Sequence, residues 1–283
     1  MTNENRFAIV VHACDRYEFL FKGFHYFFMK HWGVQPGCNV YFISENKDIS
    51  LPGLTNIKSG SGPWSDRLRN ALGQLEEEYV IYIQEDAWLA KPVDRNFFAQ
   101  LFDFIERHPV KVLKLHSSDI YVTEATGDYI DGLNIAKLDM AKSRFLMSHQ
   151  ISLWNREFLM GQLPAGEHPW RNERKGTKRL KALGYPIYHI DYFSDSGKEA
   201  INKNRVSAPA SLYYTVSTNS MLRDVAMPFI EELWQKPETR EYAEALKHHF
   251  DNRITHDGQP GARKTGVWDK AKKWVRNALP KRN

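Results

Sequence analysis

The sequence predicts an α/β protein in which a mostly parallel central sheet is covered by helices on both faces, an αβα sandwich. The leading observation is the segment 79–83, an apolar and aromatic run without polar alternation, which is typical of a strand buried on both faces. Similar runs recur along the chain and alternate with segments whose apolar residues follow helical spacing. Charged residues follow several of the runs directly, as Glu85 and Asp86 do here.

The expected elements alternate through most of the chain. We expect strands at residues 7–11, 39–43, 79–83, 111–115, 150–154 and 185–190. We expect helices at residues 17–31, 63–75, 92–105, 155–163 and 228–250. Residues 166–176 are polar and rich in turn formers, and residues 252–261 have the composition of a linker.

Length and composition favour an intracellular enzyme. The chain has 283 residues and 42% hydrophobic content, enough to bury one large core or two small ones. We assign residues 1–255 to one domain and residues 256–283 to a linker and basic tail. Two cysteines, Cys14 and Cys38, favour a reducing compartment over a disulfide framework. The start of the sequence lacks the apolar core of a signal peptide, and no apolar run reaches the ~20 residues that cross a bilayer.

Acidic residues at the ends of the predicted strands point to a nucleotide site. Asp15 follows the first strand, Glu45 the second, and Glu85-Asp86 the strand at 79–83. Ligands of open α/β sheets bind just beyond the carboxyl ends of the strands. An early acid accepts hydrogen bonds from a base or ribose, and a later one holds Mg²⁺ or Mn²⁺ against a diphosphate. The glycine-rich loops of common dinucleotide and P-loop sites are missing from the sequence.

Two parts of the sequence resemble glycosyltransferases. Residues 67–87 resemble the core of the GT-A fold, in which a helix containing Arg-Asn-Ala precedes a strand ending in Asp-x-Asp. Residues 150–154 and 167–173 are similar to the acceptor-side segment of bacterial surface-polysaccharide glycosyltransferases. The resemblance implies a GT-A-like (Rossmann-like) αβα sandwich. It also implies sugar transfer from a nucleotide-sugar donor to a glycan or lipid-linked acceptor in capsule or lipopolysaccharide assembly.

The metal motif departs from this pattern at its first acid. Gln84 stands where the motif has a carboxylate, so the segment reads Gln84-Glu85-Asp86. Because an amide is a weaker ligand than a carboxylate, we expect Asp86 to be the best ligand for Mn²⁺ or Mg²⁺ and Glu85 the second. Alternatively, the two acids cap the next turn or pair with Lys91.

The candidate donor-binding residues lie at the strand ends and on the helix after residue 63. They are His12, Asp15, Arg16, Glu45, Trp64, Arg67, Glu85 and Asp86. Arg67 and Arg69 are two residues apart on a helix and cannot face the same way, and we favour Arg67 for the diphosphate. Trp64 either stacks on the base or staples the start of its helix.

The segment 167–173 carries the candidates for acceptor chemistry. An inverting transferase needs a general base to take the proton of the acceptor hydroxyl. Glu167 is the first choice and Glu173 the second, and Trp170 offers a flat surface to an acceptor sugar. The alternative is an ion-paired loop among the neighbouring arginines and lysines, and a retaining mechanism needs no such base.

The C-terminal tail predicts a basic amphipathic helix. Lysines and arginines fall on one helical side, and apolar residues fall on the other. The apolar residues are Val267, Trp268, Ala271, Trp274, Val275 and Ala278. This pattern is typical of contact with an anionic membrane surface, which would make the protein peripheral at the cytoplasmic face of the membrane. The alternative is a terminal helix docked on its own domain.

Two rival functions remain open at this stage. One is a different nucleotide-sugar or nucleotidyl-transfer enzyme on a similar sheet. The other is a non-catalytic, membrane-associated binding or scaffold protein, which Gln84 makes plausible. Nucleic-acid binding is disfavoured because no recognised motif accompanies the basic tail. Zinc is disfavoured by the spacing of Cys14 and Cys38, although His116 and His189 fall at strand ends.

Overall fold

The computed structural model describes residues 6–33, 38–195, 198, 200–201 and 211–261. The chain divides into two compact units, Met1–Val216 and Ser217–Asn283, and each is described by itself. The predicted domain boundary at residues 255 and 256 stays a prediction. Residues 262–283, which carry the predicted amphipathic helix, lie outside the described residues.

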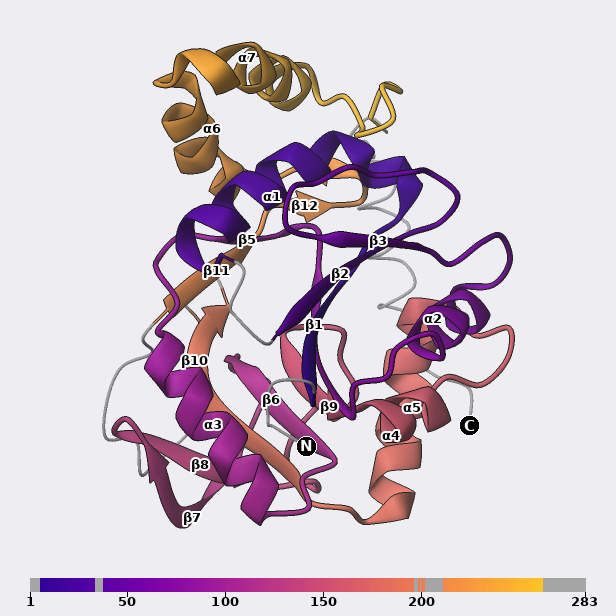
Figure 1. The fold of residues 1–283 in the computed structure, drawn as a ribbon, viewed down its shortest axis with the longest axis vertical. Coiled ribbons are helices and arrows are strands. Elements are labelled where there is room, and N and C mark those ends of the chain that lie inside the picture. Colours follow the sequence, from indigo (N-terminus) through magenta and orange to yellow (C-terminus); the bar gives the residue numbers. More distant parts are fainter. Residues whose placement is uncertain (1–5, 34–37, 196–197, 199, 202–210, 262–283) are drawn as a thin grey trace, which may run out of the picture. The chain divides into compact units, whose positions relative to one another are not determined.

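The first unit is built on an eleven-stranded sheet (Figure 1). Its main path runs in the order β3-β2-β1-β4-β9-β6-β10-β11-β5. These strands are β1 (Phe7–His12), β2 (Asn39–Ser44), β3 (Thr55–Lys58), β4 (Tyr79–Gln84), β5 (Ala87–Leu89), β6 (Val112–Ser117), β9 (Ser152–Asn155), β10 (Ile187–Asp195) and β11 (Ser211–Thr215). The hairpin of β7 (Thr123–Ile130) and β8 (Leu133–Leu138) pairs with β10. Along the main path only β9 and β5 run antiparallel to their neighbours, so the sheet is mostly parallel as expected.

The sheet is strongly curled between β4 and β5. Only Glu85 and Asp86 separate the two strands, so the chain spans at most ~11 Å from Gln84 to Ala87. In the order of strands, however, β5 lies five positions from β4, which in a flat sheet would be ~24 Å. The far edge of the sheet therefore curves back toward the carboxyl end of β4.

Helices cover both faces of this sheet, which confirms the layered α/β arrangement. On one face, α1 (Glu18–His31) and α3 (Arg95–Arg107) contribute an aromatic core in which Phe7 stacks on Phe102 and Trp32 packs against Phe98. On the other, α2 (Trp64–Leu72), α4 (Arg156–Gly161) and α5 (Pro169–Leu183) pack on a mainly aliphatic cluster. Figure 1 shows the two groups of helices on opposite sides of the sheet.

Most predicted elements are confirmed, and one is wrong. Each predicted strand is observed, as are the predicted helices up to residue 163. Residues 166–176, expected to be turn-rich, instead lead into α5, which begins at Pro169 with His168 as its N-cap. Proline is tolerated in the first helical turn, and Gly176 lies where an added Cβ would come within 2.7 Å of Met147. The two residues that looked like turn signals thus serve helix initiation and close packing.

The second unit contains a short hairpin and two helices. The hairpin pairs β12 (Ser217–Thr218) with β13 (Met221–Leu222). The helix expected at 228–250 is divided into α6 (Met227–Trp234) and α7 (Pro237–Asn252), because proline cannot continue a helix from the preceding residues. Residues 252–261, expected to be a linker, form a turn in which buried His256 bonds through Nε2 to Ser217 Oγ at 2.7 Å.

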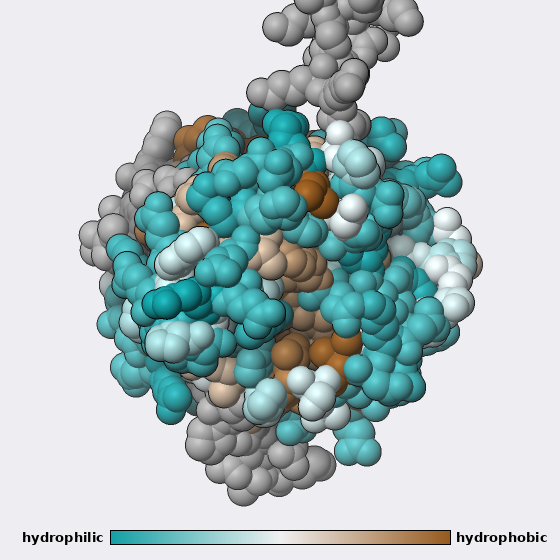
Figure 2. Space-filling model, turned by 90° about the horizontal axis from the view of Figure 1, so that it is seen from above, coloured by the Kyte–Doolittle hydropathy of each residue, from teal (hydrophilic) through white to brown (hydrophobic). Residues whose placement is uncertain are grey.

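The face drawn in Figure 2 is mostly hydrophilic, with a band of hydrophobic residues running across it. Within the described ranges, no helix is both long and apolar enough to span a bilayer.

Candidate functional site

The candidate site lies where three parallel strands end at the same level. β1 is flanked by β2 and β4, and His12 at its end is in register with Ile43 on one side and Gln84 on the other. In the sheet, β2 and β3 lie on one side of β1, and the next strand in the sequence, β4, lies on its other side. The carboxyl ends at such a change of direction are the usual ligand site of open α/β sheets.

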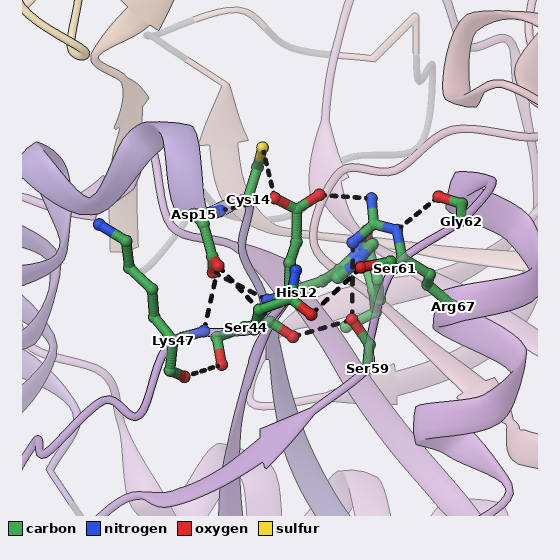
Figure 3. A network of polar contacts seen from close by, with 12 residues as sticks. His12, Cys14, Asp15, Ser44, Lys47, Ser59, Ser61, Gly62 and Arg67 are labelled. Atoms are coloured by element: carbon green, nitrogen blue, oxygen red, sulfur yellow. Dashed lines mark hydrogen bonds and ion pairs between the residues drawn. The ribbon is translucent and has the colours of Figure 1, made fainter.

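Asp15 holds the loop that follows β2. Its Oδ1 accepts a hydrogen bond from the backbone N–H of Glu45 at 2.8 Å. Its Oδ2 accepts bonds from the N–H groups of Asn46 and Lys47 at 2.8 and 3.1 Å (Figure 3). A carboxylate that accepts three backbone bonds fixes the conformation of the loop. Asp15 thus joins the end of β1 to the end of β2.

Glu45 extends this connection to Arg67 on α2. Glu45 Oε1 lies 2.7 Å from Arg67 Nη2, and Glu45 Oε2 accepts a bond from the backbone N–H of Asp15 at 3.2 Å. The Arg67 guanidinium is largely buried and also donates from Nε to the carbonyl of Gly62 at 3.0 Å. Three predicted site residues, Asp15, Glu45 and Arg67, are therefore brought together in one polar chain (Figure 3). We call it the Asp15–Glu45–Arg67 network.

Glu85 and Asp86 form the two-residue turn between β4 and β5. Glu85 is 4% exposed, and burial followed by the charge of Asp86 raises its pKa well above the usual value. Asp86 is half-buried, and its carbonyl accepts a bond from Val216 N–H at 2.9 Å. The two acids sit beyond β4 as predicted, but in different environments.

These two carboxylates fit a divalent cation only in part. Throughout the described part of the chain, no three His, Cys, Asp or Glu side chains are grouped closely enough to hold a metal ion. Mg²⁺ is often held by one or two carboxylates together with substrate phosphates, and a half-buried Asp86 suits that role. Glu85 suits it less, because its buried carboxyl favours the neutral form.

Trp64 and His12 border a group of buried rings beside the network. His12 Nδ1 lies 2.9 Å from the Tyr82 hydroxyl, and burial, with a smaller effect of Arg67, lowers the pKa of His12 to about 3. The ring of Trp64 meets the ring of His149 edge-on at 4.6 Å and lies 5.9 Å from that of His12. These contacts favour a packing role for Trp64, and stacking on a base stays a prediction.

A buried Lys114 and a half-buried Glu173 lie beyond these rings. Lys114 is fully buried on β6 and donates from Nζ to Ser148 Oγ at 3.1 Å; burial lowers its pKa to about 7, against the opposing effect of Glu173. Glu173 Oε1 accepts a bond from His149 N–H at 3.2 Å, and burial raises the pKa of Glu173. Sequence reasoning missed Lys114, although a lysine inside an otherwise apolar strand was a signal for it.

Glu167, the first choice of general base, is committed to an ion pair. Both of its carboxylate oxygens accept bonds from Arg179, at 3.1 and 2.9 Å, and one also accepts from Asn172 at 2.8 Å. Burial alone would raise the pKa of Glu167, but these bonds outweigh it and hold the pKa below its usual value. A saturated, acidic carboxylate is a poor proton acceptor, so we rank Glu173 ahead of Glu167.

The remaining predicted residues lie apart from the network. Arg16 is exposed in the short 3₁₀ turn Asp15–Tyr17. Trp170 is 69% exposed in the first turn of α5. His116 and His189 are buried on β6 and β10, where His116 Nε2 lies 2.8 Å from the Tyr121 hydroxyl and His189 Nε2 lies 3.5 Å from Asp191. Among the described residues, neither histidine belongs to a group of three side chains that could hold a metal ion.

Comparisons with known proteins give distant structural similarities. No family model and no curated protein matches the sequence. Among solved structures, S. aureus TarS is similar over 88% of this chain, with 14% identity and a TM-score of 0.46. This chain spans 43% of the length of that structure.

Two further structures are enzymes that use nucleotide sugars. The mannosyltransferase PcManGT from Pyrobaculum calidifontis, solved with GDP-Man and Mn²⁺, is similar over 98% of this chain and 81% of that chain, with 11% identity and a TM-score of 0.45. A UDP-glucose pyrophosphorylase complexed with UDP-glucose is similar over 65% of this chain and 89% of that chain, with 9% identity and a TM-score of 0.41. At such low values, the function has to be argued from the residues of this chain.

The depressed pKa of Lys114 predicts a pH-dependent stability. With a pKa of about 7 when folded and 10.5 as its ordinary value, Lys114 is charged mainly in the unfolded chain between these limits. The unfolded state then binds more protons, so the penalty for burying Lys114 falls as pH rises from about 7 toward 10.5. We expect Lys114→Met to stabilise the protein at pH 7 and to lose this advantage by up to about 1.4 kcal/mol per pH unit.

Urea denaturation of both proteins at pH 7, 8 and 9 measures the difference in unfolding free energy. Titration of the other groups is common to the two chains and cancels in that difference. A difference that stays constant with pH would show that Lys114 titrates normally.

Proposed function

We propose that this protein transfers a sugar from a nucleotide-sugar donor to a glycan or lipid-linked acceptor. The observation that carries the proposal is the gathering of Glu45, Arg67 and Asp86 around the level carboxyl ends of β1, β2 and β4. A nucleoside diphosphate needs acceptors for its ribose hydroxyls and base N–H groups, and a cation for its phosphates. Carboxylates and a guanidinium at one sheet edge supply both.

The donor would bind against the Asp15–Glu45–Arg67 network. The guanidinium of Arg67 is oriented by Gly62 and Glu45, so its fork is held in place before a phosphate arrives. Asp15 acts indirectly in this proposal, because both of its oxygens already hold the loop at residues 45–47. Arg16 and Trp64 are proposed to contact the base and ribose, and buried His12 to support Trp64 from behind through its ring contact.

A divalent cation would be held by Asp86, with Glu85 as the weaker partner, and by the phosphates of the donor. When bound, it would neutralise charge on the departing diphosphate. The protein's own part is to keep Asp86 half-buried at the end of β4 by means of its tight turn into β5.

Glu173 is the proposed general base for an inverting transfer. Its raised pKa brings proton uptake closer to neutral pH, and a base works best when its pKa lies near the working pH. Its carboxylate is anchored by His149 N–H, and Lys114 supplies a nearby positive charge. Trp170, one helical turn earlier on α5, is proposed to contact the acceptor sugar.

The wider setting is proposed from the sequence. Assembly of a bacterial capsule, lipopolysaccharide or related surface glycan would supply a lipid-linked acceptor at the cytoplasmic face of the membrane. The basic tail at residues 262–283 would draw the protein to that face.

A non-catalytic binding protein is the second candidate. Gln84 in the metal motif and the lack of a three-ligand cluster among the residues described here favour it. A nucleotidyl-transfer enzyme on a similar sheet would bind the same nucleotides but would not transfer a sugar.

Nucleotide calorimetry tests the donor site. We expect one of UDP, GDP, CDP and CMP to bind in the presence of Mn²⁺, and we expect Asp86→Asn to weaken that binding at least tenfold, because the amide is a poorer ligand. The matched control is Asp131→Asn, the same change at the tip of the β7–β8 hairpin, which should leave the affinity unchanged.

Each outcome of this titration has a defined meaning. Binding without Mn²⁺ that is equal in wild type and Asp86→Asn would keep the nucleotide site and remove Asp86 as a metal ligand. If none of the four nucleotides binds, the nucleotide-sugar proposal fails and the non-catalytic candidate takes its place.

The proposed roles of Glu173 and Glu167 can be distinguished by measuring the turnover and the unfolding temperature of variants at each position. With the donor that calorimetry identifies, we expect Glu173→Gln to reduce turnover about 10²–10⁴-fold while nucleotide affinity is retained. Glu167→Gln should instead lower the unfolding temperature, since Arg179 loses a charged partner, and change turnover per folded molecule only a few fold. Turnover is followed by release of the nucleotide that calorimetry identifies, and the reverse pattern would restore Glu167 as the base.

A further inference from the structure

The outer face of α5 carries a dense group of exposed cations. The exposed residues of this face are Trp170, Arg171, Arg174, Lys175, Lys178 and Lys181. At 3.6 residues per turn they fall within an arc of about 140°. We call this set the α5 basic face. It is formed entirely by described residues and is separate in sequence from the basic tail.

The cations of the α5 basic face form no ion pairs with the described acids, although Lys175 lies near enough to Glu167 to lower its pKa slightly. None of its five cations makes an ion pair with another described residue. The single acid on α5 is Glu173, which is half-buried and bonded to His149, and nearby Glu167 is taken up by Arg179 on the inner side. Exposed lysines elsewhere in the unit do find acids, as Lys58 does with Asp48 at 2.7 Å.

Exposed apolar side chains stand at both ends of the same helix. Trp170 is 69% exposed in the first turn, and Leu183 and Tyr185 are 48% and 47% exposed at and just after the end. Tryptophan and tyrosine favour the boundary between lipid headgroups and acyl chains, where an apolar body and a polar tip are both satisfied. At 3.6 residues per turn Trp170 falls within the arc of the α5 basic face, whereas Leu183 falls about 80° outside it, and Tyr185 packs edge-on against Phe158. Trp170 is therefore the apolar side chain that lies beside the cations.

We infer that the α5 basic face docks on an anionic lipid surface, independently of the tail. Five unpaired cations complement the phosphates of acidic headgroups, and each basic residue near such a surface adds to its attraction. A soluble polyanion would use the cations equally well but would not bury the apolar body of the exposed Trp170, as the boundary of a bilayer would. The combination therefore favours a bilayer over a polymer.

Docking through α5 would also orient the candidate site. The inner side of this helix carries Glu173, three residues after the exposed Trp170. A lipid-linked acceptor would then meet the general base at the membrane surface. This consequence rests on the proposed function, whereas the docking itself does not.

Vesicle binding of the full chain tests the docking. We expect wild type to sediment with vesicles that contain phosphatidylglycerol but not with pure phosphatidylcholine vesicles. Arg174→Gln/Lys178→Gln should weaken partitioning about 25-fold, which is about fivefold for each charge removed. The control is Lys91→Gln/Arg107→Gln, which removes two exposed cations on or beside α3 and should change partitioning less than twofold. All three proteins keep the tail, so its contribution is shared.

A third variant distinguishes lipid from polymer. Trp170→Ala should weaken binding to phosphatidylglycerol vesicles while leaving binding to soluble polyphosphate unchanged. Equal losses in both double variants would overturn the inference, because binding would then follow net charge alone. Binding to polyphosphate with no detectable vesicle binding would overturn it in favour of an anionic polymer. Nucleotide calorimetry on the same proteins reports separately on the proposed function.

Discussion

The Asp15–Glu45–Arg67 network is the interaction on which the candidate site depends. Parallel pairing brings the ends of β1, β2 and β4 level, but it does not fix the loops that leave those ends. Asp15 fixes one loop through three backbone bonds, and Arg67 ties that loop to α2 through Glu45. Bonds to charged groups contribute about 1.5–3 kcal/mol each, so the network can hold a polar surface in place over an apolar sheet.

The curl of the sheet has a chemical consequence at the same edge. Because β5 follows β4 after two residues, the turn is too short to withdraw both acids into water. Glu85 is buried and Asp86 is half-buried, and burial, followed by the charge of Asp86, raises the pKa of Glu85 well above its usual value. Lys114 and Glu173 lie beyond the rings of Trp64 and His149. Burial lowers the pKa of Lys114 and raises the pKa of Glu173. The unit thus combines a fixed binding edge with a buried lysine whose pKa is lowered to about 7 and a glutamate whose pKa is raised.

Local sequence patterns predicted the strands and the strand-end acids, because burial on both faces leaves an unbroken apolar run and a polar residue marks its end. They failed where distant partners decide the outcome. For Glu167 the sequence leaves a general base and an ion pair both open, and only the fold identifies Arg179, twelve residues later on α5, as its partner. Pro169 and Gly176 read as turn formers, yet the first occupies a helical N-terminus and the second packs against Met147. Lys114 is the reverse case: its strand was predicted, but its burial next to Ser148 depends on β9 and the segment before it.

The central claim is that the carboxyl ends of β1, β2 and β4 form a nucleotide site oriented by Arg67. A crystal structure of the protein grown with Mn²⁺ and the nucleotide of highest affinity tests it most directly. We expect nucleotide density at this edge, with a phosphate within hydrogen-bonding distance of Arg67 and the base or ribose beside the loop at residues 45–47. An ordered nucleotide bound elsewhere, with the Glu45–Arg67 pair untouched, would contradict it.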